Sequence, residues 1–485
     1  MSLRRLRLVP VLAGLLLLMV PAIASAQEAG IEEVIEGTII GVDQTFILIA
    51  AALVLFMQAG FAMLEVGMSR MKNAGAVAGK IIVNLSVSFL VFWAVGFAIA
   101  FGDGNGFMGY TGWFLDGGFE SFSVLEGTVP IEGMFFFQTV FVAVSLAIVF
   151  GAMLDRVKFP AYIAFGVIYV GLIYPIVAHW SWGGGWLDER GFVDFAGSSI
   201  VHLNGALAAM VGTIMLGARL GKFRNGRAVP IPGHSVPLMI LGVLILWVGW
   251  MGFNPGSALA AVGANFADVA VNTNLAAAAG VLGATLMSLL LMKTLDVSQM
   301  GNGAIAGLAA ITAPCAFVDP WAAILIGFVG GGIVPLVVLG LERLRIDDVV
   351  GAIPAHGTSG IWGTFALGLF ATETRLTTNW GTDGVAGLFY GGSPSFLWVQ
   401  TYGVLVTIAF TATACVAAFW LIKATIGLRV SEEEELRGLD ISEHGMFGYP
   451  ERFIEVPGAD AGDVATTTPP AATGPSPSAS PAPAS

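Results

Sequence analysis

The stretch EGMFFFQTVFVAVSLAIVFGAM, residues 132–153, decides the class of fold. It is long enough to cross the hydrocarbon core of a bilayer as one helix, which takes about 20 mostly apolar residues. The chain then reaches Arg156 and Lys158, and basic residues of this kind flank membrane spans on the cytoplasmic side. The stretch therefore predicts a transmembrane helix whose C-terminal end lies at the cytoplasmic side.

Similar apolar segments recur on both sides of this stretch. They predict an all-α membrane protein with eleven transmembrane helices, at about 44–67, 78–102, 132–153, 160–179, 196–217, 236–259, 271–293, 301–319, 321–341, 352–371 and 397–422. The composition agrees, because 56% of the residues are hydrophobic and only 11% are charged, whereas soluble proteins average about 25% charged residues. Pro314, Asp319 and Pro320 crowd the end of the eighth segment.

Basic residues fix the expected orientation. Those in loops after even-numbered segments are only Arg190 and Arg375. Those after or at the end of odd-numbered segments are Arg70, Lys72, Lys80, Arg156, Lys158, Arg219, Lys222, Arg224, Arg227, Lys293, Arg343 and Arg345. Because cytoplasmic loops carry the excess of Lys and Arg, we expect an outside N-terminus, an inside C-terminus and a multi-pass protein of the inner (plasma) membrane.

The two ends of the chain differ from the apolar middle. Residues 1–26 read as a signal peptide, with Arg4, Arg5 and Arg7 before an apolar stretch and Ala24-Ser25-Ala26 as the cleavage site. The alternative is a true first span. If the signal peptide is removed, residues 27–43 form a short outer segment before the transmembrane domain, 44–423.

The residues after the last span predict a cytoplasmic tail in two parts. Residues 424–456 are polar, with the acidic run Glu432 to Glu435, and are expected to be ordered. Residues 457–485 are rich in Pro, Ala, Ser and Thr, which predicts disorder. A net charge of −12 argues against a nucleic-acid partner, and Cys315 and Cys415 lie in apolar stretches that suggest no disulfide or metal framework.

Two histidines lie within predicted membrane spans, where an ionisable group is energetically costly. His202 falls in the fifth predicted span and His356 in the tenth, and an intramembrane ionisable residue is a functional candidate by default. A repeat of five helices inverts on repetition, which would bring both imidazoles to the midplane where the repeats meet. The alternative is a pair of structural histidines. Asp194, eight residues before His202, would on its own be a helix N-cap.

The segment Asp194-Phe-Ala-Gly-Ser-Ser-Ile-Val-His202-Leu-Asn204 resembles the signature of the ammonium transporter (Amt/Mep/Rh) family, of the bacterial Amt type. Further stretches agree with the family in order, over roughly residues 44–450. They are AMLEVGMSRMKN (62–73), FQTVF (137–141), GAMLDRVKF (151–159), HWSWGGG (179–185), WMGFNPGS (250–257), HGTSGIWG (356–363) and GLDISEHG (438–445).

The resemblance implies eleven helices as a five-plus-five inverted repeat plus a final helix, a homotrimer, and one ammonium channel per subunit for nitrogen uptake. Trp182 and Ser257 would recruit the cation at the outer face, supported by Asp194. Phe141 and Phe253 would form a gate above His202 and His356, with Trp250 and Asn254 nearby in the pore region. Without the resemblance, Phe141 and Phe253 read as packing and Trp182 as part of an interfacial belt.

The family further implies no metal, no cofactor and no enzymatic activity, and makes a PII-type signalling protein a plausible partner at the cytoplasmic face. The sequence departs from commoner members at Pro255 and Gly351, and we expect these departures to affect rate or regulation rather than substrate. Three alternatives stay open: an ammonium sensor acting through the tail, a Rh-like gas channel, and a metalloenzyme. The metalloenzyme would use His179, His202, His356 and Asp194.

Overall fold

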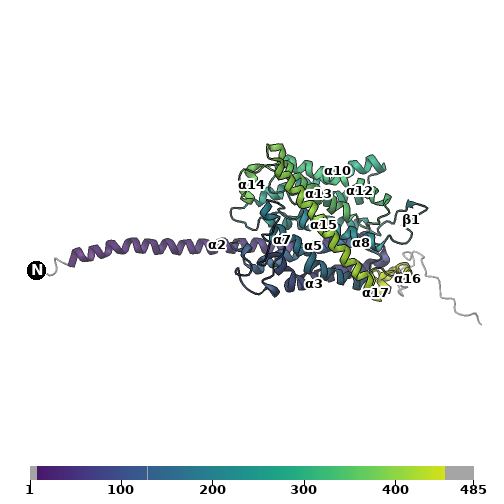
Figure 1. Ribbon diagram of the computed structural model, residues 1–485, viewed down its shortest axis with the longest axis horizontal. Helices are drawn as coiled ribbons and strands as arrows, with labels where there is room; N and C mark the ends of the chain where they lie inside the picture. Colours follow the sequence, from purple (N-terminus) through teal and green to yellow (C-terminus); the bar gives the residue numbers. More distant parts are fainter. Residues whose placement is uncertain (1–7, 128, 454–485) are drawn as a thin grey trace, which may run out of the picture.

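The structure is a bundle of membrane-spanning helices with two very short strands (Figure 1). The computed structural model describes residues 8–127 and 129–453, with residues 8–32, 451 and 453 as backbone alone. The longer helices are α2 (Leu8–Met68), α3 (Ala74–Val91), α5 (Ile131–Gly151), α6 (Phe159–Ile168), α7 (Tyr174–Trp182), α8 (Asn204–Leu216), α9 (Val236–Phe253), α10 (Phe266–Met292), α11 (Val297–Ile311), α12 (Pro320–Arg343), α13 (Ser359–Phe370) and α15 (Pro394–Thr425).

Short helices and turns fill the loops and the tail. They are η1 (Met71–Asn73), α4 (Phe97–Phe101), η3 (Trp113–Leu115), η4 (Ser123–Leu125), η6 (Asp188–Arg190), η8 (Pro255–Ala258), α14 (Glu373–Trp380), η10 (Leu388–Tyr390), α16 (Glu432–Arg437), α17 (Leu439–His444) and α18 (Pro450–Phe453). Strands β1 (Phe223–Arg224) and β2 (Arg227–Ala228) pair antiparallel in one loop.

Within the described ranges, nine helical stretches are long and apolar enough to cross a membrane. The predicted class, a multi-pass helical membrane protein, is therefore confirmed. The eighth and tenth predicted segments are not among the nine. Helix α11 has only 15 residues, and the tenth segment begins with a polar, histidine-bearing turn. The count of eleven and the orientation stay predictions.

The predicted leader and the last part of the tail lie largely beyond what the structure describes. Residues 1–7 and 454–485 are outside the described ranges, and residues 8–26 form the start of α2. In Figure 1 this part of α2 projects away from the bundle. Signal-peptide cleavage and disorder after residue 457 therefore stay predictions.

Glycines allow the helices to pack closely, as membrane helices prefer when small residues face each other. A Cβ added at Gly331 of α12 would meet the carbonyl oxygen of Gly280 on α10. A Cβ at Gly242 of α9 would likewise meet the backbone at Leu64 of α2. These pairs bring the backbones of α10 and α12, and of α2 and α9, into direct contact.

Four described segments are π-helical turns, which often mark functional positions. They are η2 (Phe92–Gly96), η5 (Tyr169–Ile173), η7 (Ser198–Leu203) and η9 (Ile353–Thr358). The last two contain His202 and His356. Both predicted histidines therefore sit on widened helical turns, which the sequence does not predict.

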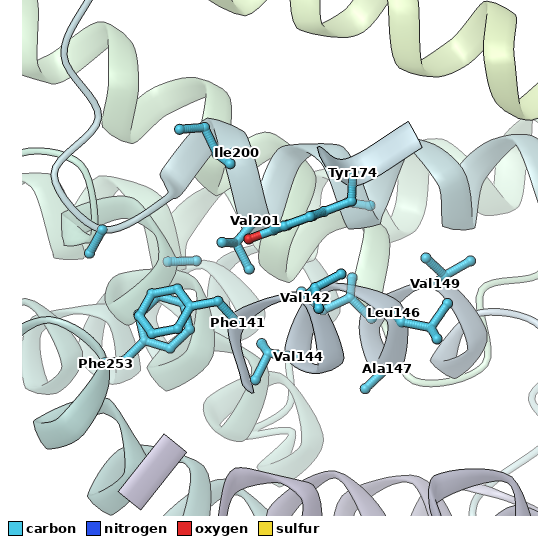
Figure 2. Packing of buried hydrophobic residues seen from close by; sticks show 14 of the residues in the cluster. Phe141, Val142, Val144, Leu146, Ala147, Val149, Tyr174, Ile200, Val201 and Phe253 are labelled. Carbon is cyan, nitrogen blue, oxygen red and sulfur yellow. The ribbon is translucent and has the colours of Figure 1, made fainter. Parts of the chain in front are cut away.

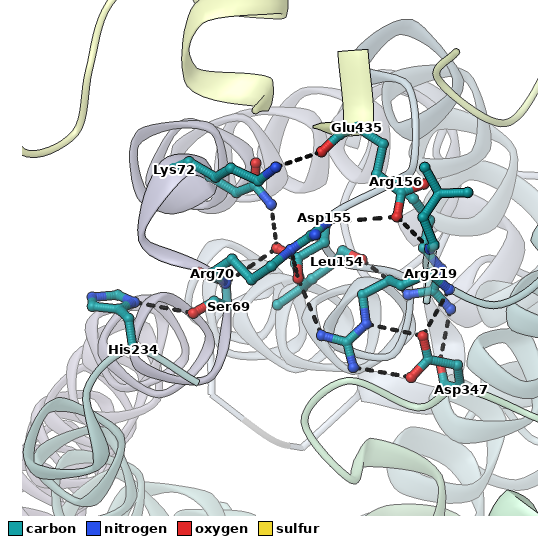
Figure 3. A network of polar contacts seen from close by, with 12 residues as sticks. Ser69, Arg70, Lys72, Leu154, Asp155, Arg156, Arg219, His234, Asp347 and Glu435 are labelled. Atoms are coloured by element: carbon teal, nitrogen blue, oxygen red, sulfur yellow. Dashed lines mark hydrogen bonds and ion pairs between the residues drawn. The ribbon is translucent and has the colours of Figure 1, made fainter. Parts of the chain in front are cut away.

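The two ends of the bundle differ in character. Figure 1 places α14 at one end, and β1, α16 and α17 at the other; we call these the α14 end and the α16 end. At the α16 end a buried network of charges ties loops to the tail (Figure 3). Arg219 pairs with Asp155 at 3.1 Å and with Asp347 at 2.9 Å. Glu435 of α16 pairs with Arg429 at 2.6 Å.

The sequence places Glu435 in an acidic run of the polar tail, but the structure buries it completely. Its second oxygen accepts a hydrogen bond from the backbone N–H of Leu220 at 2.7 Å. Asp440 of α17 also accepts the N–H of Ala76, near the start of α3, at 2.8 Å. Carboxylates of the tail therefore bind backbone donors of the bundle.

Candidate functional site

The structure brings His202 and His356 together in the interior of the bundle. The two rings are stacked, with centroids 5.3 Å apart and planes at 23°. Both residues are buried. Among the described residues, neither ring nitrogen of His202 has a hydrogen-bond partner, nor has Nδ1 of His356. Buried polar atoms are normally hydrogen-bonded. A small polar molecule between the rings would supply the hydrogen-bond partners that these nitrogens lack.

Asp194 fixes the turn that carries His202. Its Oδ1 accepts the N–H groups of Gly197 and Ser198 at 2.9 and 2.8 Å. Its Oδ2 accepts those of Ser199 and Ile200 at 2.8 and 3.0 Å. Burial raises the pKa of Asp194 to about 6, and these four hydrogen bonds keep it from rising further. The carboxylate therefore accepts the first backbone N–H groups of the turn, whose N-cap residue is Gly197.

Asp348 caps the turn that carries His356, as Asp194 caps the turn that carries His202. The sequence motifs do not point to Asp348. Its carboxylate accepts the N–H groups of Gly351, Ala352 and Ile353 at 3.0, 3.1 and 2.8 Å. Burial raises the pKa of Asp348 to about 6. A signal for it was present, because each aspartate precedes its histidine by eight residues.

The departure at Gly351 has a conformational reason. Its φ of +78° lies in the left-handed region that favours glycine. A Cβ at this position would also collide with the amide of Asn302. The cap of the second histidine turn therefore requires glycine here.

The predicted gate residues lie against the histidine pair. Phe141 of α5 and Phe253 of α9 are stacked, with centroids 4.1 Å apart and planes at 27° (Figure 2). The ring of Phe253 is 5.4 Å from that of His202. We call Phe141, Phe253, His202 and His356 the ring column. Its members come from four elements, so tertiary packing alone assembles it.

A cavity of about 230 Å³ lies at the α14 end of the ring column, with Phe141, Trp182 and Ser257 in its wall. The rest of its lining is Phe101, Val124, Leu125, Met134, Phe137, Gln138, Ser181, Asp188, Phe195, Leu259 and Trp380. We call it the Trp182 cavity. Burial, followed by the charge of Glu189, raises the pKa of Asp188 at its edge.

The two predicted recruitment residues have their donors occupied. Trp182 donates Nε1–H to the backbone carbonyl of Asp194 at 2.8 Å, which fixes the indole ring. Ser257 donates its hydroxyl hydrogen to the carbonyl of Phe253 at 2.8 Å. A hydroxyl oxygen keeps its acceptor capacity after donating. The cavity therefore offers a π face and an acceptor oxygen, which suits a cation.

The remaining predicted residues take different places. Trp250 stacks on His202 at 5.2 Å and donates Nε1–H to Thr312 at 3.1 Å, so it supports the ring column from the side. Asn254 is buried and donates to Thr273 of α10 at 3.0 Å. His179 is held through both ring nitrogens, by carbonyl oxygens at 3.0 and 2.8 Å.

The chain matches the model of the Ammonium Transporter Family over residues 45–449. The ammonium transporter Amt2 of Archaeoglobus fulgidus is 43% identical over 90% of this chain and 94% of its own length. A solved "Sensor Amt Protein" superposes with a TM-score of 0.77 at 35% identity, covering 84% of this chain and all of that one. Mep2 of Candida albicans gives a TM-score of 0.75 at 28% identity, covering 81% and 87%.

Proposed function

This chain belongs to the ammonium transporter family, and we propose that it recruits NH₄⁺ in the Trp182 cavity, deprotonates it and conducts ammonia past the histidine pair. The family consists of transporters rather than enzymes, which contradicts the metalloenzyme alternative. The observation that carries the proposal is the ring column, which leads through an apolar interior from the Trp182 cavity to the histidine pair. Among the described residues, both ring nitrogens of His202 and Nδ1 of His356 lack a hydrogen-bond partner.

Recruitment rests on the π face of Trp182 and the oxygen of Ser257. A cation over an indole ring gains about 2 kcal/mol when it is partly desolvated. Asp194 supports this site indirectly, since its backbone carbonyl holds the indole and its carboxylate caps the turn of His202.

Selection rests on chemistry rather than size. A bare ion pays several kcal/mol to enter a low-dielectric interior, whereas ammonia pays only the cost of a neutral hydrogen-bonding molecule. Ammonium can lose a proton and potassium cannot. The stacked Phe141 and Phe253 would keep hydrated ions out, and the free nitrogens of His202 and His356 would accept ammonia.

We further propose eleven spans, an outside N-terminus and a homotrimer in the plasma membrane for nitrogen uptake. The basic residues Arg70, Arg156 and Arg219 gather at the α16 end, which supports a cytoplasmic position for that end. The same end carries the ordered part of the tail, and a PII-type protein would dock there.

The test is transport by purified protein in vesicles, with His202→Ala and His356→Ala compared with the wild type. Each variant is expected to lower ammonium-dependent flux or to admit potassium, because truncation removes the polar partners of ammonia or widens the path. Assembly is checked by size-exclusion chromatography. Unchanged flux together with unchanged potassium rejection in both variants would refute the mechanism, and a wild type without transport would favour a sensor.

A further inference from the structure

A second, much smaller cavity lies at the other side of the histidine pair. It measures about 20 Å³ and is lined by Phe61, Leu64, Glu65, Ile148, Gly151, Leu246, Asn302, Ile305, Val350, Ala352, Ala355 and His356. A cavity needs about 10–15 Å³ of this kind of volume to hold one water. There is therefore room for one molecule the size of water or ammonia, with His356 in its wall.

This lining is apolar apart from His356, Asn302 and Glu65. The amide of Asn302 is engaged, since its Nδ2–H donates to the carbonyl of Val350 at 2.9 Å. Glu65 lies near the end of α2 and is 2% exposed. Gly151 makes room for it, because a Cβ there would lie 3.3 Å from Oε1 of Glu65.

Within the described residues, the carboxylate of Glu65 has no hydrogen bond and no ion pair within 4.0 Å. Besides His356, the titratable groups that face it are Lys80 of α3 and Tyr162 of α6. Lys80 is committed elsewhere, to Glu443 at 3.9 Å and the carbonyl of Val157 at 3.3 Å. Tyr162 donates its hydroxyl to the carbonyl of Lys80 at 2.6 Å.

An ionised carboxylate without a partner is costly in an apolar interior, so Glu65 requires either a cation or a proton. We propose that Glu65 is the proton-exchange group below the histidine pair, where it returns to ammonia the proton removed at the Trp182 cavity. The inference rests on the proposed function and adds a residue that the ring column does not include.

NH₄⁺ loses a proton at the Trp182 cavity, and this proton passes by way of His202 to His356, whose ring centroid lies 5.3 Å away. The protonated His356 gives it, through the molecule in the small cavity, to the Glu65 carboxylate, which leaves a neutral imidazole and a carboxylic acid. The carboxylic acid then gives that proton to ammonia, which leaves NH₄⁺ and the carboxylate. The net result is the passage of one NH₄⁺, with its proton and its nitrogen travelling separately.

Two readouts on vesicles separate the proton from the nitrogen: the ammonium-evoked current reports net charge, and uptake of isotope-labelled nitrogen above that of protein-free vesicles reports ammonia entry. Glu65→Gln is expected to lower the current by at least about 100-fold, the lower end of a general acid–base contribution, while ammonia entry persists. Glu342→Gln is the matched control. It removes a carboxylate at the same end, paired with Lys222 at 2.7 Å and away from the cavity, and is expected to behave as wild type.

The inference is overturned if Glu65→Gln keeps the wild-type current, or if current and ammonia entry fall in the same proportion. If the Gln variant does not assemble, Glu65→Asp tests the same proton-exchange role. Its shorter side chain is expected to lower the ratio of current to ammonia entry, and an unchanged ratio contradicts the proposal. A wild type that admits ammonia without current also overturns it, whereas a wild type with neither readout refutes the proposed function instead.

Discussion

Trp182 and Ser257 are the two residues that form the proposed cation site. Both use their hydrogen-bond donors on backbone carbonyls, at 2.8 Å in each case. What they leave to the cavity is a ring face and an acceptor oxygen, and neither carries a formal charge. A site of this kind binds a cation weakly enough to release it, as conduction requires.

Replacing Trp182 should therefore weaken binding more than turnover. Trp182→Leu removes a contact of about 2 kcal/mol, which corresponds to a rise of about 30-fold in the half-saturating ammonium concentration. The measurement is initial uptake rate against ammonium concentration. Trp186→Leu is the control, because Trp186 packs on Trp180 and does not line the cavity. Equal half-saturating concentrations in the two variants would count against a cation–π site.

At the level of residues, the sequence reveals polar or ionisable side chains that interrupt an apolar segment. An imidazole within an apolar run is conspicuous, so His202 and His356 stand out, and the family motifs add Phe141, Phe253 and Trp182. Glu65 and Asp348 do not stand out, because each lies near the end of an apolar segment, where charged residues are ordinary. Only the packing of α2 against α5 and α9 shows that Glu65 is buried.

The elements that matter most for the site are η7 and η9. Each is a six-residue π-helical turn, each carries one histidine, and each begins at a cap formed by an aspartate. The apolar runs predict helices here but not this widening, since hydrophobic periodicity does not distinguish an α-turn from a π-turn. The inverted repeat expected from the span order is consistent with this pairing of caps and histidines.

Close packing of α10 against α12 requires glycine at position 331. Gly331→Ala on α12 would press a methyl group against the backbone of Gly280 and is expected to destabilise the protein by about 1–3 kcal/mol. Gly340→Ala on the same helix meets nothing within 4 Å, so it should leave stability unchanged or raise it slightly. Thermal unfolding of both variants in detergent gives the comparison. Equal midpoints would contradict close α10–α12 packing.

For the whole molecule, the α16 end is the place where distant parts of the chain meet. Arg219, Asp155 and Asp347 join three loops, and Glu435 brings in the tail (Figure 3). The positive-inside pattern predicts the basic residues of this end but not their partners. The sequence predicts that carboxylates in loops and in the tail are exposed to solvent. Only the tertiary fold brings them into contact with the arginines.

This network predicts a dependence of stability on pH. Burial alone would raise the pKa of Asp347, but the hydrogen bond from Arg219 and the charges of Arg156 and Arg219 outweigh it and hold the pKa below its usual range. An aspartate in the unfolded chain titrates near 3.9. The contribution of Asp347 to the free energy of unfolding is therefore complete above about pH 4 and is lost as the pH falls further.

Asp347→Asn tests this dependence. The variant should be less stable than the wild type at pH 7, by about 3 kcal/mol for a broken buried pair, and the difference should shrink below about pH 4. Asp268→Asn is the control, since its pair with Arg375 is half exposed and contributes little. Thermal midpoints across pH provide the measurement. A difference that does not change with pH would contradict an ionised, paired Asp347.

The ring column is proposed to pass ammonium-derived nitrogen and to reject bare ions. The wild-type arm of the vesicle assay tests this selectivity, with equal gradients of ammonium and of potassium applied to the same purified protein. We expect rapid, saturable uptake with ammonium and no flux above that of protein-free vesicles with potassium. Potassium flux comparable to ammonium flux, or no ammonium flux at all, would contradict it.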